Sequence, residues 1–132
     1  MDLKLITVRQ ELPRGFLESE KFALIIVPLE TCEGCVNFLL NMAKDNIGSD
    51  SIKFIFFAQG PTKKIDILFT KGQVDGSSNI FFDKAGLTIK HKLGNSYYPM
   101  LYFVNNDHIE EEKVLKTETF IDDLNKIHTY FN

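Results

Sequence analysis

The chain has 132 residues, 44% hydrophobic and 25% charged, which is ordinary for a globular protein and long enough to bury a core without added staples. Its net charge of −3 offers no basic surface for nucleic acid. No apolar run approaches the ~18 residues of a membrane span. We therefore predict that residues 1–132 form a single domain with no transmembrane segment and no nucleic-acid partner.

The start of the chain, MDLK, lacks the charged and apolar regions of a signal peptide, which predicts a cytoplasmic protein. An export signal removed ahead of this start would instead imply a periplasmic or envelope-attached protein. The two cysteines, Cys32 and Cys35, are too few for the disulfide framework of a small secreted domain.

The first half of the chain reads as two buried strands around a helix. Residues 3–8 are predicted to form a first strand. Residues 22–27 are a continuous apolar run rich in β-branched side chains, typical of a strand covered on both faces. Apolar residues between 35 and 47 follow the spacing of a largely buried helix that ends at Gly48. Residues 52–58 repeat the buried-strand pattern.

The second half completes an α/β pattern. It is predicted to contain, in order, a helix over 62–72 capped by Thr62, a central strand over 79–83, a short helix within 86–94, a hairpin of 100–104 with 109–115, and a helix capped by Thr117. Strands that alternate with helices imply parallel pairing, and the hairpin adds antiparallel strands. The predicted fold is α/β: a central mixed β-sheet flanked by helices, with a C-terminal β-hairpin and helix.

The run Thr31-Cys32-Glu33-Gly34-Cys35 is the candidate reactive site. Residues i and i+3 are neighbours on a helix, so the two sulfurs can meet. The free N–H groups and the dipole of a helix N-terminus favour a thiolate on Cys32. Cys32 would attack a partner's disulfide, and Cys35, more buried, would resolve the mixed disulfide. Gly34 leaves room for another backbone to approach.

Other uses of a C-x-x-C pair fit less well. A zinc site needs about four ligands, and the chain has no second cysteine pair and no histidines at matching spacing. A structural disulfide or a pair of inert core thiols is the remaining alternative. The position after a buried strand and at a helix start favours redox chemistry. No metal and no cofactor are predicted.

The order strand, C-x-x-C, helix, strand resembles the thioredoxin superfamily across nearly the whole chain. The second anchor is the Ser-Tyr-Tyr-Pro run at 96–99, just before a strand, which looks like the family's cis-proline loop. By this resemblance, Cys32 is the nucleophile, Cys35 the resolving cysteine, and Pro99 the cis-proline with Tyr98 before it. In the family, that loop packs against the cysteines and presents backbone to substrates.

The resemblance is greatest to one branch of the superfamily. The Asp-Lys-Ala-Gly turn at 83–86 and the Cys-Glu-x-Cys motif look most like the bacterial ResA/TlpA-type thiol–disulfide oxidoreductases, which are usually exported. The residues implied in substrate binding are Thr31, Gly34, Tyr98 and Pro99.

The sequence departs from thioredoxin itself at three positions. Thr31 stands where a tryptophan usually precedes the first cysteine, and Gly34 stands where proline is usual. Ile26, six residues before Cys32, stands where thioredoxin carries a buried aspartate. Without that acid, proton transfer to and from Cys35 needs another group or water.

Glu30 and Glu33 are the candidates for that proton transfer, although solvated carboxylates at a helix start are the plainer interpretation. Both acids also oppose a thiolate on Cys32. At ~7 Å a carboxylate costs on the order of 0.6 kcal/mol in water and ~2.4 kcal/mol at an effective dielectric of 20. The helix terminus contributes ~0.3–2 kcal/mol the other way. Because the opposing free energies from the carboxylates and the helix terminus are comparable, we predict a moderately lowered pKa for Cys32.

The resemblance implies an enzyme, a thiol–disulfide oxidoreductase that acts on protein or small-molecule disulfides and receives electrons from an upstream thiol reductant. Reduction or isomerisation suits it better than strong oxidation. One alternative is a binding module of the same fold without redox turnover. Another is a thiol peroxidase, since residues 28–35 nearly match P-x-x-x-T-x-x-C. Cys32 stands where threonine should be, and the only arginines, Arg9 and Arg14, are far away in sequence.

Overall fold

A computed structural model describes residues 3–13, 15–59, 77–116 and 118–131 of the chain. The elements are α1 (Leu3–Glu11), β1 (Lys21–Pro28), α2 (Glu33–Asp45), β2 (Ile52–Phe57), β3 (Ile80–Asp83), α4 (Leu87–Lys90), β4 (Met100–Asn105), β5 (His108–Val114) and α5 (Phe120–Phe131). The helix predicted over 62–72 and the predicted cap at Thr117 lie outside the described residues.

The described strands form one mixed sheet in the order β3-β2-β1-β4-β5. β1, β2 and β3 are parallel neighbours, whereas β4 runs antiparallel to β1 and β5 antiparallel to β4. Ile26 near the end of β1 is opposite Met100 at the start of β4. The end of β1, the end of β2 and the start of β4 therefore share one edge of the sheet, and the predicted α/β fold class is confirmed.

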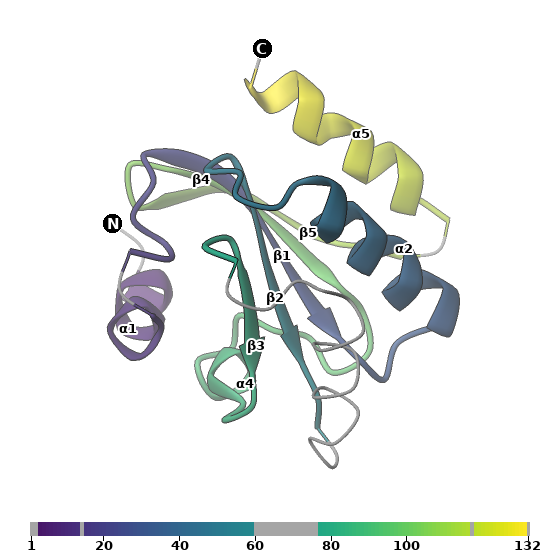
Figure 1. The fold of residues 1–132 in the computed structure, drawn as a ribbon, viewed down its shortest axis with the longest axis horizontal. Helices are drawn as coiled ribbons and strands as arrows, with labels where there is room; N and C mark the ends of the chain where they lie inside the picture. The colour runs from purple at the N-terminus through teal and green to yellow at the C-terminus, as the bar shows by residue number, and fades with distance from the viewer. Residues whose placement is uncertain (1–2, 14, 60–76, 117, 132) are drawn as a thin grey trace.

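β1 is apolar at successive positions because helices cover both of its faces (Figure 1). One set of its side chains, including Ile25, packs with α2 and α5. The alternate set, including Ile26, packs with α1 and the segment around Leu93. Both clusters are closed to solvent at their centres.

The prediction of a strand over residues 3–8 is wrong, because this segment is the helix α1. Leu5, Val8 and Leu12 are buried against the sheet at spacings of three and four residues, which is the period of a helix face. The alternation of Leu3, Leu5 and Thr7 gave a false strand signal, since a segment this short fits either period.

The hairpin of β4 and β5 follows the predicted turn chemistry. Asn105 pairs with His108, and the two residues between them, Asn106 and Asp107, have φ of 50° and 69°. Two positive φ angles are what a tight hairpin turn requires, and Asn and Asp tolerate them. The three glutamates that follow on β5 are exposed, as expected for an edge strand.

Lys53 is a buried cation at the beginning of β2, on the edge of the sheet opposite the cysteines. Its Nζ donates a hydrogen bond to the carbonyl oxygen of Phe16 and lies 5.1 Å from the ring centroid of Phe22. Burial lowers the pKa of Lys53.

Among the helices that the structure describes, none is long and apolar enough to cross a membrane.

Candidate redox site

Cys32 is the N-cap residue of α2, and its sulfur is joined to that of Cys35 in a disulfide. The chain leaves β1 at Pro28 and turns, with the Thr31 N–H donating to the Pro28 carbonyl at 3.2 Å. The backbone N–H of Cys35 donates to Sγ of Cys32 at 3.0 Å. The sulfur thus takes the place that a Ser or Asp oxygen usually has at a helix start.

The two cysteines differ in exposure. Cys32 is exposed, whereas Cys35 is half-buried and packs against the core between α2 and the sheet. A thiolate on Cys32 would keep the Cys35 N–H as a donor and lie at the positive end of the helix dipole. The geometry therefore supplies one accessible sulfur and one sheltered sulfur within bonding distance.

Hydrogen bonds tie together the segments around the disulfide. The Leu29 N–H donates to the Phe57 carbonyl at 2.8 Å. Oε1 of Glu30 accepts from the Gln59 N–H at 2.6 Å, and Nε2 of Gln59 donates to the Ser96 carbonyl at 2.9 Å. Gln59 thereby links the loop before α2, where Glu30 precedes it by 29 residues, to the loop before β4, where Ser96 follows it by 37 residues.

The loop before β4 carries Tyr98 and Pro99. Pro99 is buried, Tyr97 and Tyr98 are exposed, and the Pro99 carbonyl accepts from the Leu115 N–H at 2.8 Å. The predicted cis-proline is not found: among the described residues no peptide bond is cis. The bond before Pro99 has the trans form, which X–Pro bonds favour by about 0.5–1 kcal/mol. Before it, Oδ1 of Asn95 accepts hydrogen bonds from the N–H groups of Tyr97 and Tyr98, and this turn leads towards β4.

Asn95→Ala is expected to loosen this loop without unfolding the protein. It leaves the N–H groups of Tyr97 and Tyr98 without their acceptor, at a cost of about 1 kcal/mol, or roughly a fivefold rise in local opening. Amide hydrogen exchange of Tyr97 and Tyr98 measures it, and Asn95→Asp, which keeps the acceptor oxygen, is the control. Equal exchange in Asn95→Ala and the parent would show that the turn holds without Asn95.

The departures from thioredoxin have structural counterparts. Ile26 is fully buried, so an apolar side chain occupies the position of the family's buried acid. Glu30, one of the two candidate proton carriers, uses one carboxylate oxygen to accept from Gln59. Thr31 is half-buried. A Cβ built at Gly34 would have no heavy atom within 4 Å, so this position is open to solvent.

An apolar hollow of about 250 Å³ lies directly beside the disulfide. It is lined by Cys32, Gly34, Cys35, Phe38, Phe120 and Ile121. The sequence interpretation did not single out Phe38 as a residue of the candidate site. The available signal was that Phe38 follows Cys35 by three residues, which places both on one face of α2.

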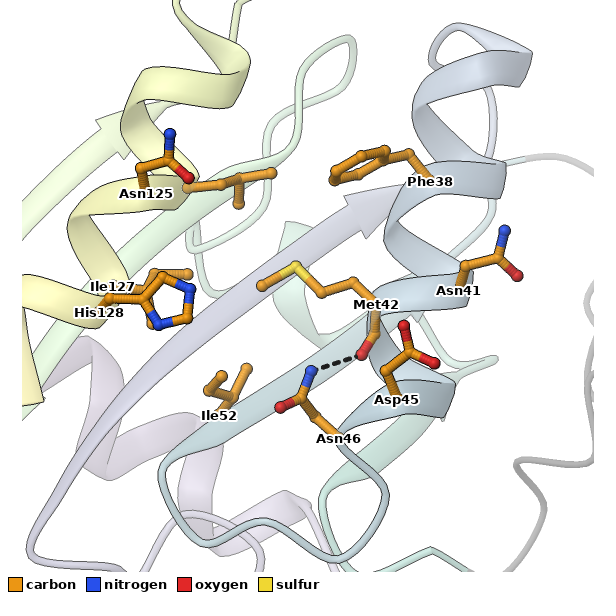
Figure 2. A pocket seen from close by; sticks show the side chains of 10 residues that line it. Phe38, Asn41, Met42, Asp45, Asn46, Ile52, Asn125, Ile127 and His128 are labelled. Atoms are coloured by element: carbon orange, nitrogen blue, oxygen red, sulfur yellow. Dashed lines mark hydrogen bonds between the residues drawn. The ribbon is translucent and has the colours of Figure 1, made fainter.

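A larger pocket of about 480 Å³ lies further along the seam between α2 and α5 (Figure 2). Met42 of α2 reaches towards Ile127 and His128 of α5, and Phe38 of α2 lies level with Asn125 of α5. Ile52 also lines the pocket. The side-chain amide of Asn46 donates to the Met42 carbonyl at 2.7 Å. Phe38 lines both hollows, so the surface continues from the disulfide along this seam.

Arg9, the arginine that the structure describes, lies away from the sulfurs. Arg9 forms an ion pair with Asp107, in the hairpin turn at the far edge of the sheet from Cys32. Arg14 lies outside the described residues. In the parts of the chain that the structure covers, no group of three or more His, Cys, Asp or Glu side chains is placed to hold a metal ion.

A scan against protein-family models gave no match, and a search of curated proteins gave none either. Solved structures do match. A candidate thioredoxin from Neisseria meningitidis aligns with a TM-score of 0.57 at 14% identity, covering 91% of this chain and 80% of that one.

Two further structures agree. A secreted disulfide oxidoreductase of Mycobacterium tuberculosis, homologous to E. coli DsbE, gives a TM-score of 0.54 at 13% identity, covering 86% and 84% of the two chains. The C-terminal domain of a candidate thiol–disulfide oxidoreductase from Bacteroides thetaiotaomicron gives 0.52 at 11% identity, covering 86% and 80%. The protein therefore has the fold of the thioredoxin-like thiol–disulfide oxidoreductases.

Proposed function

We propose that the protein is a thiol–disulfide oxidoreductase, an enzyme of one domain that exchanges disulfides through Cys32 and Cys35. The observation that carries this proposal is the pairing of an exposed sulfur at the start of α2 with a half-buried one three residues later, on a thioredoxin-like fold. A disulfide needed only for stability gains little from an exposed sulfur at a helix N-terminus. A reactive disulfide needs a sulfur that the partner can reach and a helix N-terminus that stabilises its thiolate.

The proposed cycle begins with both cysteines reduced. The Cys32 thiolate attacks one sulfur of the partner's disulfide, and the other partner sulfur leaves as a thiolate that takes a proton from water. Cys35 then gives its proton to water, and its thiolate attacks Sγ of Cys32. The mixed disulfide breaks, the second partner thiol is released, and the protein is left with the Cys32–Cys35 bond. An upstream thiol reductant returns the two electrons by the same exchange in reverse.

Substrate contact is assigned to the surface around the exposed sulfur. The open position at Gly34 supports close approach of a partner backbone. Thr31 flanks Cys32 in the chain, and the exposed Tyr98 with buried Pro99 lies at the same edge of the sheet. We assign these residues to positioning the partner segment against Cys32. The secreted neighbour favours an exported setting, in which the reductant would be a dedicated donor.

The charges around Cys32 favour a reductase or isomerase over a strong oxidant. The Cys35 N–H and the helix dipole stabilise a thiolate, while Glu30 in the preceding turn opposes it. Strongly oxidising disulfide oxidoreductases have a reduced form that a very stable thiolate favours. Here the thiolate is only moderately stabilised, so the reduced form is less favoured and the protein is a weaker oxidant.

A redox titration tests the proposal directly. The protein is equilibrated in dithiothreitol or glutathione buffers, and free thiols are counted by alkylation and mass. We expect a reversible two-electron transition with a midpoint nearer to about −270 mV than to about −120 mV. A pair that never reduces or never reoxidises would leave only the binding-module alternative. Rapid consumption of hydrogen peroxide in the presence of a reductant would instead support the peroxidase.

A further inference from the structure

Two apolar side chains in the wall of the hollow beside the disulfide lie outside the hydrophobic core. Phe38 and Ile121 line this hollow and keep 45% and 53% of their surface exposed. On α5, the core is formed by Phe120, Leu124 and Ile127, and Ile121 points out of it. Single exposed apolar residues are ordinary, but two that converge on a reactive sulfur form a contiguous patch of the kind that binds partners.

The walls come from two helices, and an aromatic contact joins α2 to α5. The rings of Phe38 and Phe120 meet edge to face, with centroids 5.5 Å apart and an interplanar angle of 75°. Cys32, Gly34 and Cys35 also line the hollow, and a Cβ at Gly34 would have no heavy atom within 4 Å. A group bound here would therefore lie against the sulfurs and remain continuous with the partner outside.

We propose that this hollow receives a large apolar side chain adjacent to the cysteine of the partner, so that the enzyme selects disulfides in polypeptides with apolar flanks. This rests on the proposed function. Burial of a Leu- or Phe-sized group gives affinity for such partners. The exposed acids Glu118 and Asp122, which flank the hollow's α5 residues in sequence, disfavour acidic partners such as oxidised glutathione.

The seam beyond Phe38 favours a polypeptide over a small disulfide. Because Phe38 lines both hollows, a chain leaving the first hollow continues over an open surface towards the pocket in Figure 2. From Cys35 to Asn46 the helix rises by about 16 Å, which about five residues of extended chain can span. A small disulfide would occupy only the first hollow.

Two short peptides test the selection. They are identical except for Leu or Ser beside a single cysteine, and each is linked as a mixed disulfide to 5-thio-2-nitrobenzoate. The reduced protein attacks and releases the coloured thiolate, which gives a second-order rate constant for each peptide. For the parent protein we expect the Leu peptide to react roughly fivefold to tenfold faster.

Ile121 and Ile47 provide matched variants. Both are half-exposed isoleucines, at 53% and 51%, but Ile47 follows α2 at its far end and does not line the hollow. We expect Ile121→Ser to reduce the Leu-to-Ser rate ratio to within twofold of one, and Ile47→Ser to leave the ratio unchanged. Phe38→Ser, which removes the other wall, should act like Ile121→Ser. Circular dichroism and thermal melting check that each variant is folded.

Equal rates for the two peptides with the parent protein would overturn this inference, and so would a preference that survives in both Ile121→Ser and Phe38→Ser. A protein that attacks neither peptide after full reduction would instead refute the proposed exchange function. The two failures are distinguishable. If only the selection fails, both peptides still react; if the exchange function fails, neither peptide reacts.

Discussion

Replacing Cys32 with serine is expected to abolish thiol–disulfide exchange, lowering its rate by on the order of 10³ or more, while the fold is retained. A serine hydroxyl is not ionised near neutral pH, so the attacking anion is lost. The side chain is exposed and its oxygen can still accept from the Cys35 N–H, as a usual N-cap does. Insulin or a synthetic disulfide peptide, with dithiothreitol as donor, provides the assay.

Cys35→Ser is the informative partner of that variant. It keeps the backbone N–H that points at Sγ of Cys32, so the thiolate and the first attack remain. Resolution is lost, and a mixed disulfide with the partner should accumulate and be visible by intact mass. If Cys32→Ser accumulates this adduct and Cys35→Ser does not, the assignment of attacking and resolving cysteine is reversed. If neither does, the pair is not an exchange site.

Local sequence signals were sufficient for the elements that carry the cysteines. The apolar run that became β1 has no polar interruption, and only a strand covered on both faces accommodates it. Cys32 and Cys35 stand between that strand and an amphipathic helix, so their place at the start of α2 follows from short-range pattern alone. The difference in their exposure follows as well, because Cys35 lies one turn inside the helix.

The surroundings of the disulfide depend on contacts that no local pattern contains. Gln59 joins Glu30 to Ser96 across 29 and 37 residues of sequence. Nothing in the sequence around Ile121 distinguishes it from the buried Phe120 and Leu124, and only the position of α5 against α2 places it beside the disulfide. The trans bond before Pro99 is a further feature that the family resemblance did not predict.

Asp83→Ala is expected to lower the free energy of unfolding by about 3–5 kcal/mol, the largest loss of stability that we predict for a single substitution. Asp83 ends β3 and is fully buried. Its Oδ1 accepts from the Leu87 N–H at 2.9 Å, and its Oδ2 accepts from the N–H and the hydroxyl of Thr88 at 2.9 and 2.8 Å. Alanine would leave two buried donors of Thr88 and the half-buried Leu87 N–H without an acceptor.

Asp83→Ala should also disturb the candidate site, because hydrogen bonds connect Thr88 to the loop before β4. The Thr88 carbonyl accepts from the N–H groups of Leu93 and Gly94 at 2.8 and 2.9 Å, and Gly94 leads into the loop that carries Tyr98 and Pro99. Chemical denaturation measures the loss, with the exposed Asp45→Ala as a control expected to change stability by less than ~0.5 kcal/mol. A lowered stability with an unchanged exchange rate below the transition would show that α4 supports the fold but not the positioning of that loop.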